Sequence, residues 1–488
     1  MNADDLFRNG CVLFEAVGDE RRFMLPMIRI LKERYGVRTI ALVRFAQDKK
    51  PLMDTGLFEA AYSTSEMLDN ATGQDADCIG EARELEVKYN TVFHYNLCDR
   101  RLYFTGCTSF PYTHVETDES YEGWVGQTVA TYRGVEDICR KHGVTVALNG
   151  RRVVTDVAKG LGLHVRSLGF SFLHDRMLWR DGLKMNGAWL AKAHANVTRS
   201  GGKIPASILE PPPWHMSVRR NFFDGIRLTS LIAGTSLIVA RTFYWRLRRY
   251  DKVVKFGYSA HRHIRFSWRR RQVYKHLVNN GTRADDLIQS GRPFVFMALQ
   301  MEPEVLLSSQ TPEFYDQIAM IHQVAKELPV GTFLAIKDHV PALGYRDMSF
   351  YRMLDTMPNV VLVDPTDYAI PLIKQARAVV SLLGRSAFEA AAFGVPVLAY
   401  SPNLFFGYLD HVHVCTDMVN VRSELQTLLS YTEEDRKRFA AEGERLLAAV
   451  DATTIDPAEY DEDEALGEAL LGSFVESFEN DLRAPTAA

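Results

Sequence analysis

The chain has 488 residues, of which 47% are hydrophobic and 24% are charged, and this is the ordinary balance of a soluble globular protein. Its length suffices for two sizeable α/β domains with extra helices. The six cysteines are scattered without a C-x-x-C pair, so we expect reduced thiols in a cytoplasm and neither a zinc site nor a disulfide framework. The first residues lack the pattern of a signal peptide, and no apolar run reaches the roughly 20 residues that span a bilayer.

The first part of the chain alternates between predicted strands and helices. An apolar run at Cys11–Val17 predicts a strand, and apolar residues at helical spacing over Phe23–Tyr35 predict a helix. Val37–Val43 predicts the next strand, and this order of elements favours a parallel sheet. The same alternation recurs with a strand at Val144–Leu148, a helix at Val154–Leu161 and a strand at Val165–Phe170.

The middle of the chain is strongly basic. The net charge is −4, but the segment Arg219–Lys275 (the basic segment) holds 15 Lys and Arg and only two acids, a net charge of +13 that leaves −17 for the rest. It contains the apolar run Leu228–Ala240, which is too short to span a membrane but suits a buried or interfacial helix. We expect peripheral contact with an anionic membrane and no nucleic-acid partner. The alternative is an internal helical face that pairs with the acidic tail.

The most regular alternation follows this segment and predicts a second α/β unit. Its predicted strands are Pro293–Leu299, Thr332–Ile336, Val360–Val363, Val379–Leu383 and Val395–Tyr400, and its predicted helices are Phe314–Leu328, Phe350–Thr356, Ile370–Ala376 and Ser386–Phe393. Beyond it we expect a helix over Ser423–Val450, an acidic stretch at Tyr460–Glu464 and a last helix over Ala465–Leu482.

The stretch Val379–Tyr400 is the most informative part of the sequence about function. Its first strand ends at Gly384, a polar turn of Arg385 and Ser386 follows, and an alanine-rich helix begins. A strand, a glycine turn and a helix place unpaired backbone N–H groups and the positive helix end where a phosphate can bind. Ser386 and Glu389 also have the spacing of a capping box, which is the structural alternative for Glu389.

Three loops of the second unit leave the carboxyl ends of strands, the edge at which open α/β sheets bind ligands. The first contains Gln300 and Glu302, the second contains Lys337 and His339, and the third is Gly384–Glu389. A nucleotide needs cations and backbone donors for its phosphates and an acceptor for its ribose. These loops supply all three, although Gln300 and Glu302 could instead bond only to loop backbone.

The same loops carry a family resemblance. Gln300 on its strand, Lys337-Asp338-His339 with a nearby proline, and G-x-S-x-x-E-A followed by G-V-P-V resemble the capsule polysaccharide biosynthesis glycosyltransferases, which have the GT-B fold and include Kdo transferases. The resemblance covers about residues 290–410. Two positions depart from the family pattern: Val340 is inserted in the K-E-H-P signature, and Arg385 replaces the Thr of the G-T-x-G turn.

This resemblance implies an inverting glycosyltransferase that moves a sugar from a nucleotide-sugar donor, such as a CMP-activated acidic sugar, to a surface-polysaccharide or lipid-linked acceptor. His339, Lys337 and the turn at 384–386 would stabilise the leaving phosphate, and Glu389 would hold the ribose. The implied donor-binding residues are Gln300, Glu302, Lys337, His339, Gly384, Arg385, Ser386 and Glu389. The general base would be Asp19 or Glu20, with Asp99, His174 and Asp175 as further candidates. We expect no cofactor and no metal, since the nucleotide sugar is a co-substrate.

The implied fold class is α/β, with two Rossmann-like domains facing a cleft, an inserted basic helical segment and C-terminal helices. We place the acceptor domain at residues 1–205, the basic helices at 206–288, the nucleotide-sugar domain at 289–435, and the C-terminal helices with the acidic tail at 436–488. The expected location is the cytoplasm, with peripheral contact at the inner face of the membrane.

Two other functions stay open at this point. The UDP-N-acetylglucosamine 2-epimerases share this architecture and also use a late Glu and a glycine turn, so an epimerase is one alternative. A non-catalytic scaffold that keeps the fold and binds nucleotide sugars is the other. Turnover of a nucleotide sugar without any acceptor would identify an epimerase, and nucleotide release on adding an acceptor would exclude a scaffold.

Overall fold

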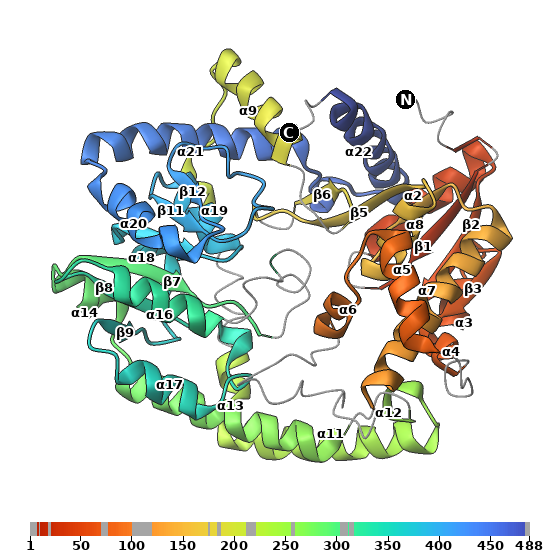
Figure 1. The fold of residues 1–488 in the computed structure, drawn as a ribbon, viewed down its shortest axis with the longest axis horizontal. Helices are drawn as coiled ribbons and strands as arrows, with labels where there is room; N and C mark the ends of the chain where they lie inside the picture. Colours follow the sequence, from red (N-terminus) through yellow and green to blue (C-terminus); the bar gives the residue numbers. More distant parts are fainter. Residues whose placement is uncertain are drawn as a thin grey trace.

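The computed structural model describes residues 7–8, 10–17, 21–69, 77–99, 120–173, 176–182, 187–210, 221–254, 259–302, 311 and 317–483 (Figure 1). Two six-stranded sheets organise these residues, one in each half of the chain. Counted from the first strand of each sheet, both have the strand order 3-2-1-4-5-6 of a Rossmann-like sheet. The predicted α/β fold class with two Rossmann-like units is therefore confirmed.

The first sheet has the order β3-β2-β1-β4-β5-β6, in which β1 to β5 are parallel and β6 runs antiparallel to β5. Its strands are β1 (Cys11–Glu15), β2 (Arg38–Val43), β3 (Ala60–Ser63), β4 (Val146–Leu148), β5 (His164–Phe170) and β6 (Met177–Arg180). Every residue of β1 is buried, as expected for a central parallel strand with helices on both faces.

The helices of the first half pack on both faces of this sheet. The helices α2 (Arg21–Tyr35) and α22 (Asp463–Arg483) pack on one face, and α5 (Cys78–Tyr89), α7 (Tyr121–His142) and α8 (Arg152–Gly160) pack on the other. Shorter helices are η1 (Ala46–Asp48), α3 (Lys49–Met53), α4 (Thr64–Asp69) and α6 (Phe93–Asp99). The last helix of the chain thus completes the core of the first unit.

The second sheet has the order β12-β11-β10-β7-β8-β9 and is parallel throughout. Its strands are β7 (Phe294–Ala298), β8 (Phe333–Lys337), β9 (Val360–Leu362), β10 (Ala378–Ser381), β11 (Val397–Ala399) and β12 (Val412–Val414). The helices α14 (Ala284–Gln289), α18 (Ala369–Gln375), α19 (Arg385–Ala392) and α21 (Glu433–Thr453) pack on one face. The other face is covered by α13 (Ala260–Asn280), α16 (Gln317–Glu327), α17 (Met348–Asp355) and α20 (Val421–Ser430).

The two halves are joined by packed side chains as well as by the chain itself. Phe172, which follows β5, lies against Phe388 and Phe405 of the second half, with ring centroids 5.9 and 5.4 Å apart. Met177 at the start of β6 pairs through its backbone with Ile455, which follows α21. Helix α9 (Gly187–Ser200) also packs against α21. Four short helical turns complete the chain: η2 (Ala206–Leu209), η4 (Val340–Ala342), η5 (Met418–Asn420) and η6 (Pro457–Glu459).

The basic segment forms a bridge of helices between the two units (Figure 1). Helix α11 (Leu228–Leu247) contacts α13 at the second unit and α12 (Asp251–Val254) at the first. The carboxylate of Asp251 accepts hydrogen bonds from the Ser65 hydroxyl at 2.8 Å and the Ala46 N–H at 3.1 Å. In the described part of the chain no helix is long and apolar enough to cross a membrane.

Three expectations for these helices need correction. No residue of α11 is buried, so the apolar run at Leu228–Ala240 does not form a buried helix. The acidic tail does not pair with the basic segment, because α22 packs on α2, where Glu468 and Arg34 form an ion pair. The helix expected over Ser423–Val450 is two helices, since Thr432 starts α21 with a capping box to Asp435.

Candidate functional site

The order of the second sheet reverses between β7 and β10, and this is where open α/β sheets bind ligands. Gln300 follows β7 and Gly384 follows β10, so the two predicted loops meet at this point. A Cβ added to Gly384 would lie 2.6 Å from the Gln300 Nε2, and Gly384 has a φ of 151°. The backbone conformation therefore favours glycine at this position, while a side chain here would also displace the end of the Gln300 side chain.

The helix α19 begins at once after this glycine. Its N-cap residue is Gly384, and no side chain of the described residues caps the helix there. The first-turn N–H groups and the positive end of the helix dipole lie at this edge of the sheet. The predicted capping box of Ser386 and Glu389 is wrong, because Ser386 lies inside the helix and Glu389 accepts a hydrogen bond from Arg385 instead.

Glu389 is a buried carboxylate on α19. It keeps 8% of its surface exposed, and its Oε1 lies 3.0 Å from the Nε of Arg385, whose own side chain is 45% exposed. Burial raises the pKa of Glu389 to about 7, and the charge and hydrogen bond of Arg385 offset only part of this rise. The carboxylate is thus held next to the glycine turn with a single ionic partner in the described structure.

The loop after β8 places its two cations differently. Lys337 is buried, and its Nζ donates to the carbonyl of Pro365 at 3.3 Å. His339 is exposed and lies at the start of η4, while its backbone N–H donates to the Asp338 Oδ1 at 2.8 Å. Desolvation lowers the pKa of His339, and the neighbouring Asp338 carboxylate opposes only part of this. Of these two predicted phosphate ligands, only His339 is accessible.

Arg346 holds the loops after β7 and β8 together, a role that no sequence pattern predicts. Its side chain is fully enclosed, with 1% of the residue exposed. Its Nη1 donates to the Asp338 Oδ1 at 2.9 Å, its Nε to the Glu302 Oε2 at 3.1 Å, and its Nη2 to the Gln300 carbonyl at 2.5 Å. Tyr351 donates to the other Asp338 oxygen. One guanidinium thus fixes two of the three predicted loops.

Gln317 at the start of α16 is a second residue that joins this network. Its backbone N–H and its Nε2 both donate to the Glu302 Oε1, at 2.9 and 2.6 Å, and its side chain bonds to both backbone groups of Gln300. Glu302 therefore serves the loop itself, which was the structural alternative for it. The Gln300 Oε1 and the Ser381 Oγ are buried without a hydrogen-bond partner among the described residues.

Most of the general-base candidates predicted in the first half of the chain lie outside the described residues. Asp19, Glu20, His174 and Asp175 lie outside the described residues, and Asp99 is the last residue of α6. The described carboxylate at the corresponding edge of the first sheet is Glu15, whose Oε2 accepts from the Arg151 N–H at 2.6 Å. Burial raises the pKa of Glu15, and Arg151 partly opposes this.

No sequence pattern identified Arg346, Gln317 or Glu15 as part of the candidate site. Arg346 lies in a loop without periodicity, and its partners are 8 to 46 residues away in sequence. Glu15 lies inside the apolar run Cys11–Val17, and the pattern of that run does not show whether its one carboxylate is buried. Only spatial contact identifies these residues.

No protein-family model matches the chain, and no curated protein matches its sequence. Solved structures resemble it only distantly. A glycosyltransferase from Rickettsia africae is 8% identical over 98% of this chain and 100% of its own, with a TM-score of 0.30. UDP-GlcNAc 2-epimerase from Neisseria meningitidis, bound to UDP-GlcNAc, is 10% identical over 96% and 99%, with a TM-score of 0.30. HepE from Anabaena, in complex with UDP and glucose, is 8% identical over 96% and 100%, with a TM-score of 0.32. Scores this low carry no argument about function.

Proposed function

We propose that the protein is a glycosyltransferase that uses a nucleotide-sugar donor. The observation that carries this proposal is the meeting of Gln300, Gly384 and the start of α19 at the point where the strand order of the second sheet reverses. A glycine at a positive φ, followed directly by a helix N-terminus, suits a phosphate that must approach the backbone closely.

The roles of the side chains follow from their places. The N–H groups of α19 and the exposed Arg385 bind the donor phosphates, and His339 approaches the same phosphates from the loop after β8. Glu389 accepts hydrogen bonds from the ribose, and Gln300 has a buried oxygen free for the ligand. Lys337 would have to leave the carbonyl of Pro365 to reach a phosphate. These groups stabilise the charge that develops on the leaving nucleotide.

The acceptor side of the proposal is a surface-polysaccharide or lipid-linked glycan, and the donor sugar is an acidic sugar activated by CMP. Asp19 or Glu20, which follow β1 in the sequence, is proposed as the general base that takes the proton of the acceptor hydroxyl. The reaction needs no cofactor besides the nucleotide sugar. A thermal-shift screen with CMP, UDP and GDP identifies the base, since a ligand that binds the native state raises its melting temperature.

Replacing His339 by Ala should weaken nucleotide binding by about tenfold, because one hydrogen bond to a charged phosphate is lost. His339 is exposed and its side chain makes no bond in the described structure that holds the fold, so the melting temperature of the free protein should stay nearly unchanged. Calorimetric titration with the nucleotide found in the screen measures the effect. His322→Ala removes another exposed histidine, on α16, and serves as the control.

Equal nucleotide affinity of His339→Ala and the parent would show that the site in the second unit is wrongly assigned. A separate assay distinguishes the two enzyme classes that share this architecture. An epimerase converts the nucleotide sugar when no acceptor is present, whereas the proposed transferase releases nucleotide only when an acceptor is added. Conversion of the donor alone into its 2-epimer would therefore contradict the proposed function.

The proposal also includes contact with an anionic membrane through α11. This helix has 20 residues and none of them is buried. Its exposed large apolar side chains are Leu228, Ile232, Leu237, Val239, Phe243, Tyr244 and Leu247. Arginines at 246, 248 and 249 follow at its end, and such basic residues add about 1 kcal/mol each next to anionic lipid. An apolar exposed helix with a cationic end suits the interface of an anionic membrane.

Replacing both Leu237 and Leu247 by Glu should reduce binding to anionic vesicles by at least about tenfold, since two apolar anchors are lost and two like charges are added. Both side chains are about 70% exposed, at 67% and 71%, so the fold should tolerate the change. Flotation with phosphatidylserine-containing and with neutral vesicles, at low and high salt, measures it. Val330→Glu, at a fully exposed position of the second unit, is the control. Failure of the parent to bind anionic vesicles at low salt would disprove the membrane contact.

A further inference from the structure

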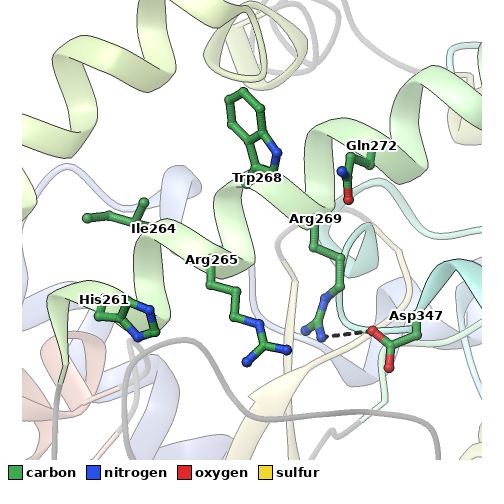
Figure 2. A pocket seen from close by; sticks show the side chains of 7 residues that line it. All are labelled: His261, Ile264, Arg265, Trp268, Arg269, Gln272 and Asp347. Carbon is green, nitrogen blue, oxygen red and sulfur yellow. Dashed lines mark hydrogen bonds and ion pairs between the residues drawn. The ribbon is translucent and has the colours of Figure 1, made fainter.

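A hollow of about 500 Å³ opens along one side of α13 (Figure 2). It is lined by His261, Ile264, Arg265, Trp268, Arg269, Gln272 and Asp347. Six of these residues are spaced three or four apart on α13, so they form one stripe of the helix. Asp347, which precedes α17, lies at one end of this stripe.

The two sides of the stripe differ in chemistry. Arg265 and Arg269 point to one side, and the Trp268 ring lies on the other (Figure 2). The Arg269 Nη1 is paired with the Asp347 Oδ1 at 3.0 Å. Arg265 is exposed and has no ion pair or hydrogen bond within the described part of the chain, and Trp268 is 51% exposed. The lining of the hollow thus includes one guanidinium without an ionic partner among the described residues and, on the other side of the stripe, an indole ring.

The hollow lies on a helix that contacts both the loop after β8 and helix α11. Arg270 donates to the carbonyls of Leu343 and Pro341 at 3.0 and 3.3 Å, and Arg269 donates to the carbonyl of Gly344 at 2.5 Å. Gly344 has a φ of +89°, and a Cβ there would lie 2.7 Å from the Arg270 Cα. Helix α13 is therefore fixed to the loop that carries His339, and it also contacts α11.

We propose that this hollow binds the phosphate group of a lipid-linked sugar acceptor. The assignment rests on the proposed function, because it takes α11 as the membrane contact and the loop after β8 as part of the donor site. Arg265 and His261 bind the phosphate, since a guanidinium is suited to phosphate oxygens and an imidazole can add a hydrogen bond. Trp268 and Ile264 pack against the adjoining sugar ring or the first carbons of the lipid.

The first test uses soluble probes. Calorimetric titration should show that the parent binds a hexose 1-phosphate, and that Arg265→Gln weakens this binding by about tenfold through loss of a charge-assisted hydrogen bond. Trp268→Ala should weaken the hexose 1-phosphate and leave inorganic phosphate unaffected, because only the sugar contacts the ring. Lys275→Gln removes another exposed cation of α13 that does not line the hollow, and it should bind like the parent.

The second test separates a lipid source of the phosphate from a soluble one. Phosphatidylcholine vesicles that contain polyprenyl phosphate should bind the parent more tightly than vesicles with phosphatidylserine of equal charge, and Arg265→Gln should remove this preference. Binding of the soluble probe without any preference for polyprenyl phosphate would overturn the lipid-linked assignment. The nucleotide thermal shift must stay unchanged in Arg265→Gln, and its loss would mean that the hollow belongs to the donor site. Absence of any nucleotide shift in the parent would instead disprove the proposed function.

Discussion

Replacing Arg346 by Met is expected to lower the free energy of unfolding by about 3–5 kcal/mol and to abolish nucleotide binding. The guanidinium is 1% exposed and pairs with the buried carboxylates of Glu302 and Asp338. Methionine fills a similar volume but leaves both carboxylates without this partner. Nucleotide binding fails because the loops after β7 and β8 lose the group that joins them. Urea unfolding and the nucleotide thermal shift measure the two effects.

Two further variants show whether the unpaired charges cause the loss. Arg352→Met makes the same substitution at an exposed position of α17 and should change the free energy of unfolding by less than about 1 kcal/mol. Adding Glu302→Gln and Asp338→Asn to Arg346→Met should restore part of the stability, because no buried charge then lacks a partner. If Arg346→Met unfolds at the same urea concentration as the parent, the network does not hold these loops.

The second sheet could be predicted strand by strand except for β12, whereas in the first sheet β1, β2, β4 and β5 were predicted and β3 and β6 were not. Parallel strands buried on both faces appear as short apolar runs between polar turns, and β7, β8, β10 and β11 all have this form. In the first sheet, β3 is only half buried along most of its length, and its sequence AAYS is barely apolar. Strand β6 pairs antiparallel with β5. An alternation of strands and helices predicts only parallel pairing, so it did not predict this strand.

The sequence predicted which loops form the candidate site but did not predict which side chains contact one another in it. The rule that ligands bind at the carboxyl ends of parallel strands selected the loops after β7, β8 and β10, and the strand order places them side by side. The direction of the Lys337 side chain could not be foreseen, because its Nζ bonds to the carbonyl of Pro365, which lies 28 residues further along the chain. The pairing of Arg385 with Glu389, at i and i+4, was available from helix geometry, but the alternative considered for Glu389 was a capping box with Ser386, three residues away.

Replacing Glu389 by Gln is expected to raise the stability of the free protein at high pH and to weaken nucleotide binding. Burial raises the pKa of Glu389 to about 7 in the folded protein, from an ordinary value of 4.5. The folded state therefore binds more protons than the unfolded state between these values, and stability falls as the pH rises through this window, by about 3 kcal/mol in total. Glu389→Gln removes the ionisable group, so the variant should be more stable than the parent by about this amount at about pH 8 and nearly equal to it at about pH 4.

Nucleotide binding should change in the other direction. If the ribose hydroxyls donate to Glu389, the parent binds nucleotide best above about pH 7, where the carboxylate is ionised, and Glu389→Gln binds weakly at every pH because an amide is a poorer acceptor. Urea unfolding and calorimetric titration at the two pH values measure both quantities, and Glu84→Gln, at an exposed position of α5, is the control. Loss of stability in Glu389→Gln at about pH 8 would show that the carboxylate holds the fold. Greater stability together with unchanged transfer activity would show that it has no part in the site. A buried carboxylate with a raised pKa beside the glycine turn is a candidate ligand group, and these two measurements together decide whether its charge serves the nucleotide.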